Sequence, residues 1–285
     1  MNIRFIINPV SGTGKQKNIK HYIQKHLDNY DIFYTKEPGD ASKISKDAVD
    51  KNIDAVIAVG GDGTVNECLQ SLVNTNTALG VIPCGSGNGF AYHIGMKRTN
   101  EEAIKQLKKN KITSIDLCSA NGMPFVNIAG IGFDAYIAKA FSRFKKRGFF
   151  NYIKLILKEL NYKPQEYRIK YDQTERNIQA YMIAFANASQ YGNDVKIAPM
   201  ANIQDGLLDF VIVKKIPKWK IPFFLLQIAI GKVHLSKYVE TIKSKKMKIT
   251  TCNPMIHLDG EPCKTSNPIT IEILIKSLKI LKPNE

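Results

Sequence analysis

The chain has 285 residues, a formal net charge of +16 and a hydrophobic fraction of 44%. This size and composition exclude a small domain stapled by disulfides and a chain without a folded core, and they suit one large domain or two of moderate size. The five cysteines include no Cys-x-x-Cys pair, which argues against a zinc site. The positive charge favours anionic partners, although a solvated lysine-rich surface would explain it as well.

The first 115 residues alternate between strand patterns and helix patterns. Short apolar runs predict strands at residues 3–8, 31–35, 55–59 and 79–82. Apolar residues at helical spacing predict helices at 18–27, 41–49 and 65–73, and a further helix after the fourth strand. Strands that alternate with helices predict an α/β layer with a parallel sheet.

The pattern changes after about residue 113. Strand-like segments separated by turn-forming residues lie at 114–119, 125–128, 168–171, 181–186, 207–213, 247–251 and 269–275. This part of the chain is therefore expected to be mainly β, in the manner of a sandwich. Two basic and aromatic stretches, residues 141–162 and 214–248, interrupt it.

The strongest local motif is Gly60-Gly61-Asp62-Gly63-Thr64, which joins the strand at 55–59 directly to a helix start. Glycines let backbone N–H groups approach a ligand closely, and a helix N-terminus favours phosphate. An acid in a phosphate loop needs a cation beside it, which suggests Mg²⁺ or a role in proton transfer. The alternative is a tight turn in which Asp62 or Thr64 caps the helix.

Two further turns follow predicted strands. Pro83-Cys84-Gly85-Ser86-Gly87-Asn88-Gly89 comes after the strand at 79–82, and Asn8-Pro9-Val10-Ser11-Gly12-Thr13-Gly14-Lys15 after the first strand. Carboxyl ends of parallel strands share one edge of a sheet, where ligands bind, so the three turns could surround one nucleotide. The first turn is not a P-loop, since Pro9 and Gln16 stand where that motif needs Gly and Ser or Thr.

Together these turns resemble the diacylglycerol kinase catalytic family, which includes bacterial lipid kinases and sphingosine kinases. The resemblance continues through Gly130-Ile131-Gly132-Phe133-Asp134, Asp205-Gly206-Leu207-Leu208-Asp209 and Leu258-Asp259-Gly260-Glu261-Pro262. It implies an α/β domain similar to that of NAD kinase at residues 1–115, followed by a β-sandwich-like lipid-substrate domain at 116–277. It also implies that the tail at about 278–285 returns to the first domain and that the active site lies in the cleft between the domains.

The resemblance also implies roles for individual residues. ATP and Mg²⁺ are the implied cofactors, and Asp62 would serve the Mg²⁺–ATP complex. Glu261 is the implied proton acceptor, and Asp134 an acidic residue that faces the cleft; these two and Asp62 form the implied catalytic set. The nucleotide would contact Asn8, Thr35, Gly60, Gly61, Asp62, Gly63, Thr64, Val65, Asn66, Glu67 and Ser86. A structural Mg²⁺ would be held by Asn202, Asp205 and the carbonyl of Leu207.

Three positions depart from the family pattern. Gly89 and Asn202 stand where many members have Asp, so the structural metal is in doubt, and Ser86 replaces a Thr but keeps its hydroxyl. Without the family, the sequence favours a turn residue over a catalytic one at Glu261 in Asp-Gly-Glu-Pro, and Asp205-Gly206 could be a plain turn.

Membrane contact is expected from the two basic and aromatic stretches. The first carries Arg143, Lys145, Lys146 and Arg147 among phenylalanines, and the second surrounds Trp219 with lysines. Such stretches suit an anionic lipid interface, or form helices with a solvated basic side. The longest apolar run, 221–230, is too short to span a bilayer, and the start of the chain lacks a signal-peptide layout. A cytoplasmic or peripherally attached protein is expected, with a homodimer as one possible form and no nucleic-acid partner.

The sequence therefore favours an ATP-dependent lipid kinase that phosphorylates a hydroxyl of diacylglycerol, a sphingoid base or a related lipid. Two alternatives stay open at this point. One is a soluble-metabolite kinase of the NAD-kinase type, and the other a nucleotide-binding membrane adaptor without catalysis.

Overall fold

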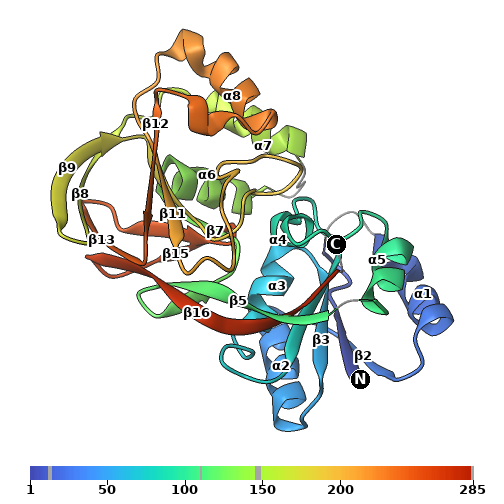
Figure 1. The fold of residues 1–285 in the computed structure, drawn as a ribbon. Coiled ribbons are helices and arrows are strands. Elements are labelled where there is room, and N and C mark those ends of the chain that lie inside the picture. Colours follow the sequence, from blue (N-terminus) through green and yellow to red (C-terminus); the bar gives the residue numbers. More distant parts are fainter. Residues whose placement is uncertain (12–14, 110, 145–148, 284–285) are drawn as a thin grey trace. The chain divides into compact units, whose positions relative to one another are not determined.

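The computed structural model describes residues 1–11, 15–109, 111–144 and 149–283. The chain forms two compact units (Figure 1). Unit 1 comprises residues 1–116 and 275–285, and unit 2 comprises residues 117–274. Two long strands, β5 (Lys111–Ala120) and β16 (Ile269–Lys282), contribute residues to both units.

Unit 1 is the α/β layer that the alternating pattern predicts. Its sheet has the strand order β2-β1-β3-β4 with all pairings parallel, and Ile280 of β16 pairs in parallel with Leu79 of β4. Its strands are β1 (Ile3–Ile7), β2 (Tyr30–Tyr34), β3 (Ala55–Gly60) and β4 (Ala78–Pro83). Its helices are α1 (Ile19–His26), α2 (Asp40–Asp50), α3 (Asp62–Leu69), α4 (Gly89–His93) and α5 (Asn100–Leu107), with a 3₁₀ turn at Lys15–Asn18.

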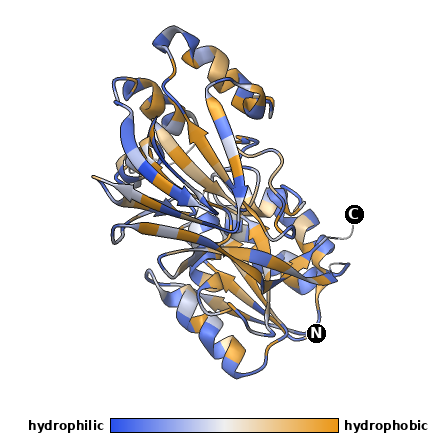
Figure 2. Cartoon of the chain, turned by 60° about the vertical axis from the view of Figure 1, so that its left-hand side comes forward, coloured by the Kyte–Doolittle hydropathy of each residue, from blue (hydrophilic) through white to orange (hydrophobic). Residues whose placement is uncertain are grey.

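The central strands of unit 1 are buried along their whole length. Every residue of β3 and β4 is buried, as expected for parallel strands covered on both faces. In Figure 2 these strands are mostly in the hydrophobic colour, whereas α2 alternates between the two colours. Helix α3 begins at Asp62, three residues earlier than its apolar spacing predicts, with Gly61 as its N-cap directly after β3.

Unit 2 contains two antiparallel sheets. One has the order β16-β13-β8-β9, and the other β12-β11-β10-β7-β14-β15, while β5 pairs with β16 and β6. The strands are β6 (Met123–Phe125), β7 (Ile128–Gly132), β8 (Gln165–Tyr171), β9 (Thr174–Ala180), β10 (Met182–Ala186), β11 (Leu208–Val213), β12 (Val239–Ser244), β13 (Lys246–Thr251), β14 (Met255–Leu258) and β15 (Glu261–Lys264). The helices are α6 (Phe133–Ser142), α7 (Phe149–Lys158) and α8 (Ile221–Ala229), with 3₁₀ turns at Lys218–Lys220 and Val233–Leu235.

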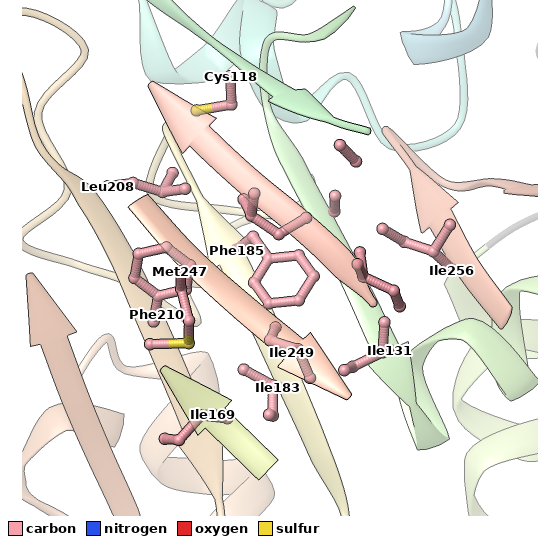
Figure 3. Close-up of a cluster of buried hydrophobic side chains, with 14 of the residues drawn as sticks. Cys118, Ile131, Ile169, Ile183, Phe185, Leu208, Phe210, Met247, Ile249 and Ile256 are labelled. Carbon is pink, nitrogen blue, oxygen red and sulfur yellow. The ribbon is translucent and has the colours of Figure 1, made fainter. Parts of the chain in front are cut away.

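The core of unit 2 lies between these two sheets. Figure 3 shows Ile183, Phe185 and Phe210 from one sheet facing Met247 and Ile249 from the other. All five side chains are fully buried. The expected β-sandwich is therefore confirmed, and its core rests on apolar residues that alternate along the strands.

Several strands of unit 2 differ from their sequence patterns. The segment predicted as one strand at 125–128 is the junction between β6 and β7. Strand β9 is mostly exposed and polar, so it shows no apolar alternation, and β14 and β15 have four residues each. Short or exposed strands leave little periodicity to read in a sequence.

Helices α7 and α8 of unit 2 lie within the two basic and aromatic stretches. Residues 141–162 include the end of α6 and all of α7, and residues 214–248 include α8. Lys145, Lys146 and Arg147 lie outside the described residues. None of the described helices combines the length and the apolar character required to cross a bilayer.

Candidate active site

Three turns meet at the carboxyl edge of the parallel sheet in unit 1. They follow β1, β3 and β4, which lie side by side. The backbone N–H of Asn8 donates to the carbonyl of Val59 (3.1 Å), and the N–H of Gly61 donates to the hydroxyl of Ser11 (3.0 Å). Within the first turn, Asn8 Oδ1 accepts from the N–H of Val10 (3.1 Å). The structure thus brings together turns that are far apart in the sequence.

The two glycine turns touch through their backbones. A Cβ atom on Gly61 would lie 3.1 Å from the Cα of Gly85, and one on Gly85 would collide with the Cα of Gly61. Only glycine allows the two backbones to come this close, so packing between the turns requires glycine at both positions. The backbones of the two turns therefore lie close together, with the N–H of Gly61 bonded to Ser11 and that of Gly85 to Asn88.

Asp62 connects the same two turns. Its Oδ2 accepts a hydrogen bond from the backbone N–H of Asn88 at 2.9 Å. The Asn88 side chain in turn accepts from the N–H of Gly85 (2.8 Å) and donates to the Gly85 carbonyl (2.9 Å). Asn88 has a left-handed backbone (φ 58°), which asparagine tolerates better than most residues. The carboxylate of Asp62 is therefore held at the start of α3 and beside the second glycine turn.

The first turn of α3 has the properties of an anion site. Helix N-termini carry N–H groups without intrahelical partners, and the N-cap residue Gly61 has no side chain with which to satisfy them. Thr64 is buried, and its hydroxyl accepts from the Asn8 side chain at 3.3 Å. Eight residues in α3 are enough to give its N-terminus a useful dipole.

The remaining residues of the expected nucleotide set occupy varied positions. Val65 is in the core, so it offers a ligand only backbone atoms. Glu67 Oε2 accepts from the N–H of Gly39 (3.0 Å), which fixes the loop before α2. Thr35 is buried, with its N–H bonded to the Ile7 carbonyl (3.0 Å), and Asn66 Oδ1 accepts from Gln70 (3.2 Å). Ser86 is half-buried in the second glycine turn.

A second polar cluster lies in unit 2 around Asp134, at the start of α6. Asp134 Oδ2 accepts from the Tyr191 hydroxyl at 2.5 Å and lies 2.9 Å from Nε2 of His257. The Nδ1 atom of His257 accepts from the N–H of Gly260 (3.2 Å), so the ring proton is on Nε2, facing Asp134. Burial and the charge of Asp134 raise the pKa of Tyr191 well above its usual value, which keeps its hydroxyl a donor.

Gly130 makes room for this cluster. It stands opposite His257 in the β7–β14 pairing, and a Cβ atom there would collide with the Asp134 carboxylate and lie 3.0 Å from His257 Nε2. This explains physically why glycine precedes the acid in the Gly130-Ile131-Gly132-Phe133-Asp134 motif.

Glu261 is exposed at the start of β15, just after a tight hairpin turn. Asp259 and Gly260 both have positive φ (49° and 90°), as expected for an Asp-Gly hairpin turn. The carboxylate of Asp259 accepts from the N–H groups of Val126 (3.1 Å) and Asn127 (2.8 Å), which anchors the turn. Helix α6 contacts both β14 and β15, so Asp134 and Glu261 lie on neighbouring elements.

An apolar cavity of about 220 Å³ opens beside Asp134. This volume far exceeds the roughly 10–15 Å³ that admits one water molecule, so it is more than a packing defect. Its walls come mainly from α6, α7 and α8, and among the described residues that line it Asp134 and Glu159 are the charged ones. Glu159 Oε2 accepts from the Tyr136 hydroxyl (2.9 Å). A long apolar ligand with one polar end matches such a lining.

The residues expected to hold a structural metal do not fit one. Asn202 Oδ1 accepts from the N–H of Gln204 (3.0 Å), and Asp205 Oδ1 from that of Leu207 (3.0 Å). Asp205 Oδ2 lies 3.1 Å from the Lys243 ammonium, which also lies 3.3 Å from the buried Asp209. A divalent ion on Asp205 would be repelled by Lys243 at close range.

Lys243 supplies the positive charge at this position instead. Burial lowers the pKa of Lys243, but its hydrogen bonds and charge interactions with Asp205 and Asp209 outweigh that effect and raise it overall. Burial also raises the pKa of Asp209, whereas the charge of Lys243 and its hydrogen bond act in the opposite direction. Lys243 therefore stabilises the charged form of this carboxylate.

Known proteins match this chain over both of its units. Residues 2–120 match the family model of the diacylglycerol kinase catalytic domain, and residues 127–282 match that of the YegS C-terminal NAD kinase beta sandwich-like domain. A protein of Chromohalobacter salexigens named "Probable lipid kinase YegS-like" is 31% identical over 82% of this chain and 78% of its own length. A Mycobacterium tuberculosis protein named "Diacylglycerol kinase" is 29% identical over 98% of this chain and 94% of its own.

A solved structure is similar throughout. The crystal structure titled as that of a diacylglycerol kinase from Bacillus anthracis superposes with a TM-score of 0.77 at 25% identity. The match covers 99% of this chain and 96% of that one. The sequence comparisons and the structure comparison therefore both extend over the two domains of this chain.

Proposed function

The chain belongs to the diacylglycerol kinase family, and from this premise we propose that it transfers the γ-phosphate of ATP to a hydroxyl of a lipid. The proposed substrates are diacylglycerol, a sphingoid base or a related lipid. Phosphorylation of a soluble dinucleotide is the main competing activity, because NAD kinases share the glycine turns.

The apolar cavity of unit 2 is the observation that carries this proposal. Its walls offer hydrocarbon contacts, with the Asp134 carboxylate and the Tyr191 hydroxyl at its polar side. A lipid tail is stabilised by about 25 cal/mol per Å² of buried apolar surface, whereas a dinucleotide would gain little there. We assign the cavity to the tail and Asp134 to a hydroxyl or amine of the headgroup.

We assign the glycine turns of unit 1 to the ATP phosphates. The N–H groups at the start of α3 would bind phosphate oxygens, and Gly61 and Gly85 keep side chains out of their way. ATP reacts as its Mg²⁺ complex, in which the ion neutralises phosphate charge, and Asp62 is the carboxylate that would hold it. The hydrogen bond from Asn88 orients Asp62 for that role.

We assign proton removal to Glu261. The lipid oxygen forms a bond to the γ-phosphorus, the bond from that phosphorus to ADP breaks, and the hydroxyl proton passes to the Glu261 carboxylate. The anchored Asp259–Gly260 turn limits the motion of the adjacent Glu261 backbone. His257 is a positioning residue, because it accepts from Gly260 of this turn and lies 2.9 Å from Asp134, which is assigned to the headgroup.

The test is a transfer assay with radiolabelled ATP, Mg²⁺ and the full chain. Diacylglycerol, a sphingoid base and NAD are offered separately, the lipids in mixed micelles. Labelled lipid supports the proposal, and labelled NADP without labelled lipid overturns it. ATP binding without transfer to any acceptor overturns it in favour of a non-catalytic nucleotide-binding protein.

A further inference from the structure

Helix α8 is apolar on two opposite faces. Its inner residues, Ile221, Phe224, Leu225 and Ile228, line the cavity of unit 2. Its outer residues, together with one in the preceding 3₁₀ turn, are exposed: Trp219 (78%), Phe223 (62%), Leu226 (54%) and Ile230 (55%). We call this second set the outer stripe. In Figure 1, α8 lies beside α7, with which it shares the cavity wall.

The outer stripe is a contiguous surface. Its residues follow one another at intervals of four, three and four, which places them along one side of the helix. Single exposed apolar residues are common on soluble proteins, but an aligned row of large ones indicates an interaction surface. A helix that is apolar all round is normally buried on all sides, so α8 lacks cover for half of its apolar surface.

The charges around the stripe indicate what covers it. Residues 214–239 contain six lysines and no Asp or Glu. The ammonium of Lys220 lies 4.6 Å from the Trp219 ring and 5.8 Å from the Tyr238 ring, and that of Lys237 lies 5.6 Å from Tyr238. Lys214 is paired with Glu240 (2.9 Å), but the segment as a whole stays cationic. Apolar side chains flanked by lysines and interfacial aromatic rings match an anionic lipid surface.

We propose that the outer stripe inserts into the headgroup boundary of an anionic membrane. Helix α8 then lies between the bilayer, on its outer face, and the cavity, on its inner face. If the cavity holds a lipid tail as proposed above, α8 is the element that a lipid passes on its way from the membrane. The insertion itself rests only on the stripe and its charges, so it can be tested without any kinase activity.

Trp219 is the single tryptophan of the chain, which makes it a built-in probe of insertion. The experiment adds the full chain to vesicles of neutral lipid alone and to vesicles in which about a third of the lipid is anionic. Without ATP or substrate, we expect a blue shift of Trp219 emission and quenching by brominated acyl chains only with anionic vesicles. Binding should weaken as salt rises, because exposed charges are screened within about 8–10 Å.

The variant Phe223→Ser with Leu226→Ser tests the stripe, and Met200→Ser with Ile112→Ser removes comparable exposed apolar surface elsewhere. Vesicle affinity should fall by about tenfold or more in the first variant and stay unchanged in the second. Activity on a short-chain soluble lipid should survive in both. Equal losses in the two variants, or an unshifted Trp219 on anionic vesicles, would overturn the proposal. So would a dimer that Phe223→Ser with Leu226→Ser dissociates, since the stripe would then face a second copy.

Discussion

The backbone N–H of Asn88 donates a hydrogen bond to Asp62 across 2.9 Å, although the two residues follow different strands. Because Asn88 also bonds both backbone groups of Gly85, the position of Asp62 depends on the conformation of the whole second turn. The acid and the glycines therefore form one structural unit, in which neither turn is correctly placed without the other.

Replacing Asp62 with Ala should abolish most turnover. The change removes the carboxylate assigned to Mg²⁺–ATP, and we expect kcat to fall by at least about a hundredfold in a protein that still folds. Loss of the hydrogen bond from Asn88 should also lower the free energy of unfolding by about 1–3 kcal/mol. Asp50→Ala, which removes an exposed carboxylate paired with Lys46, is the control and should keep full activity. Near-normal kcat in a folded Asp62→Ala protein would contradict the assignment.

Replacing Glu261 with Gln should affect the chemical step. The amide keeps the shape but cannot take a proton, so kcat should drop roughly 10²–10⁴-fold while the KM for ATP stays the same. Glu272→Gln makes the same change on β16, where Glu272 pairs with Lys246 (2.8 Å), and should leave kcat intact. A rise in the KM for ATP with preserved kcat would show that Glu261 belongs to the nucleotide site.

His257 and Asp134 should be energetically coupled. His257→Phe leaves the buried Asp134 carboxylate without one partner and should lower the free energy of unfolding by about 1–3 kcal/mol. Asp134→Asn on the same background should recover part of that loss, because it removes the charge. Denaturant titrations of the two single variants and the double variant measure the coupling, and strictly additive losses would argue against it.

Because Lys243 already places a positive charge beside Asp205, we expect the loop of Asn202 and Asp205 to be stable without a metal ion. EDTA should leave the melting temperature of the wild type unchanged. Lys243→Met should destabilise the chain by about 1–3 kcal/mol, because the buried Asp209 loses its charge partner. If EDTA destabilises the wild type instead, this loop does bind a metal in solution. Lys245→Met changes a neighbouring lysine and serves as the control.

Ionised Glu101 should stabilise unit 1, and this contribution to stability should be lost in acid. Its hydrogen bonds with Lys105, His26 and Lys25 lower its pKa to about 2. A depressed carboxyl pKa contributes stability that is fully present above its ordinary value of 4.5 and is lost as pH falls toward 2. The difference in melting temperature between wild type and Glu101→Gln should therefore shrink below pH 4.5. A difference that grows with acidity would have the wrong sign.

The sequence predicted the features that depend on local pattern. The run from Ala55 to Gly60 has no polar residue, and the Gly-Gly-Asp-Gly-Thr motif follows it at once, so strand, turn and helix could each be read from neighbours in the chain. The meeting of Ser11, Gly61 and Gly85 also followed, since parallel strands end at one edge.

Other parts of the candidate site depend on tertiary pairing and could not be read in this way. His257 stands in an apolar run, and it meets Asp134 only because β14 pairs with β7 opposite Gly130. Tyr191 lies in a loop, yet it shares the Asp134 carboxylate. Lys243 is one of many lysines, and nothing in its surroundings along the chain indicates that it would face Asp205. Such residues are identified by contacts between segments that lie far apart in the chain. A single sequence carries no record of those contacts.

The pairing of Ile280 with Leu79 has a consequence for protein synthesis. Leu278, Ile280 and Leu281 are buried in unit 1, but the ribosome makes them after all of residues 117–274. At about 5–20 residues per second, the chain from the end of β4 to Ile280 takes roughly 10–40 seconds to make, and the outer edge of β4 stays unpaired for that time. An open strand edge is a template for pairing with other chains, so the nascent protein passes through an aggregation-prone interval that the finished molecule no longer shows.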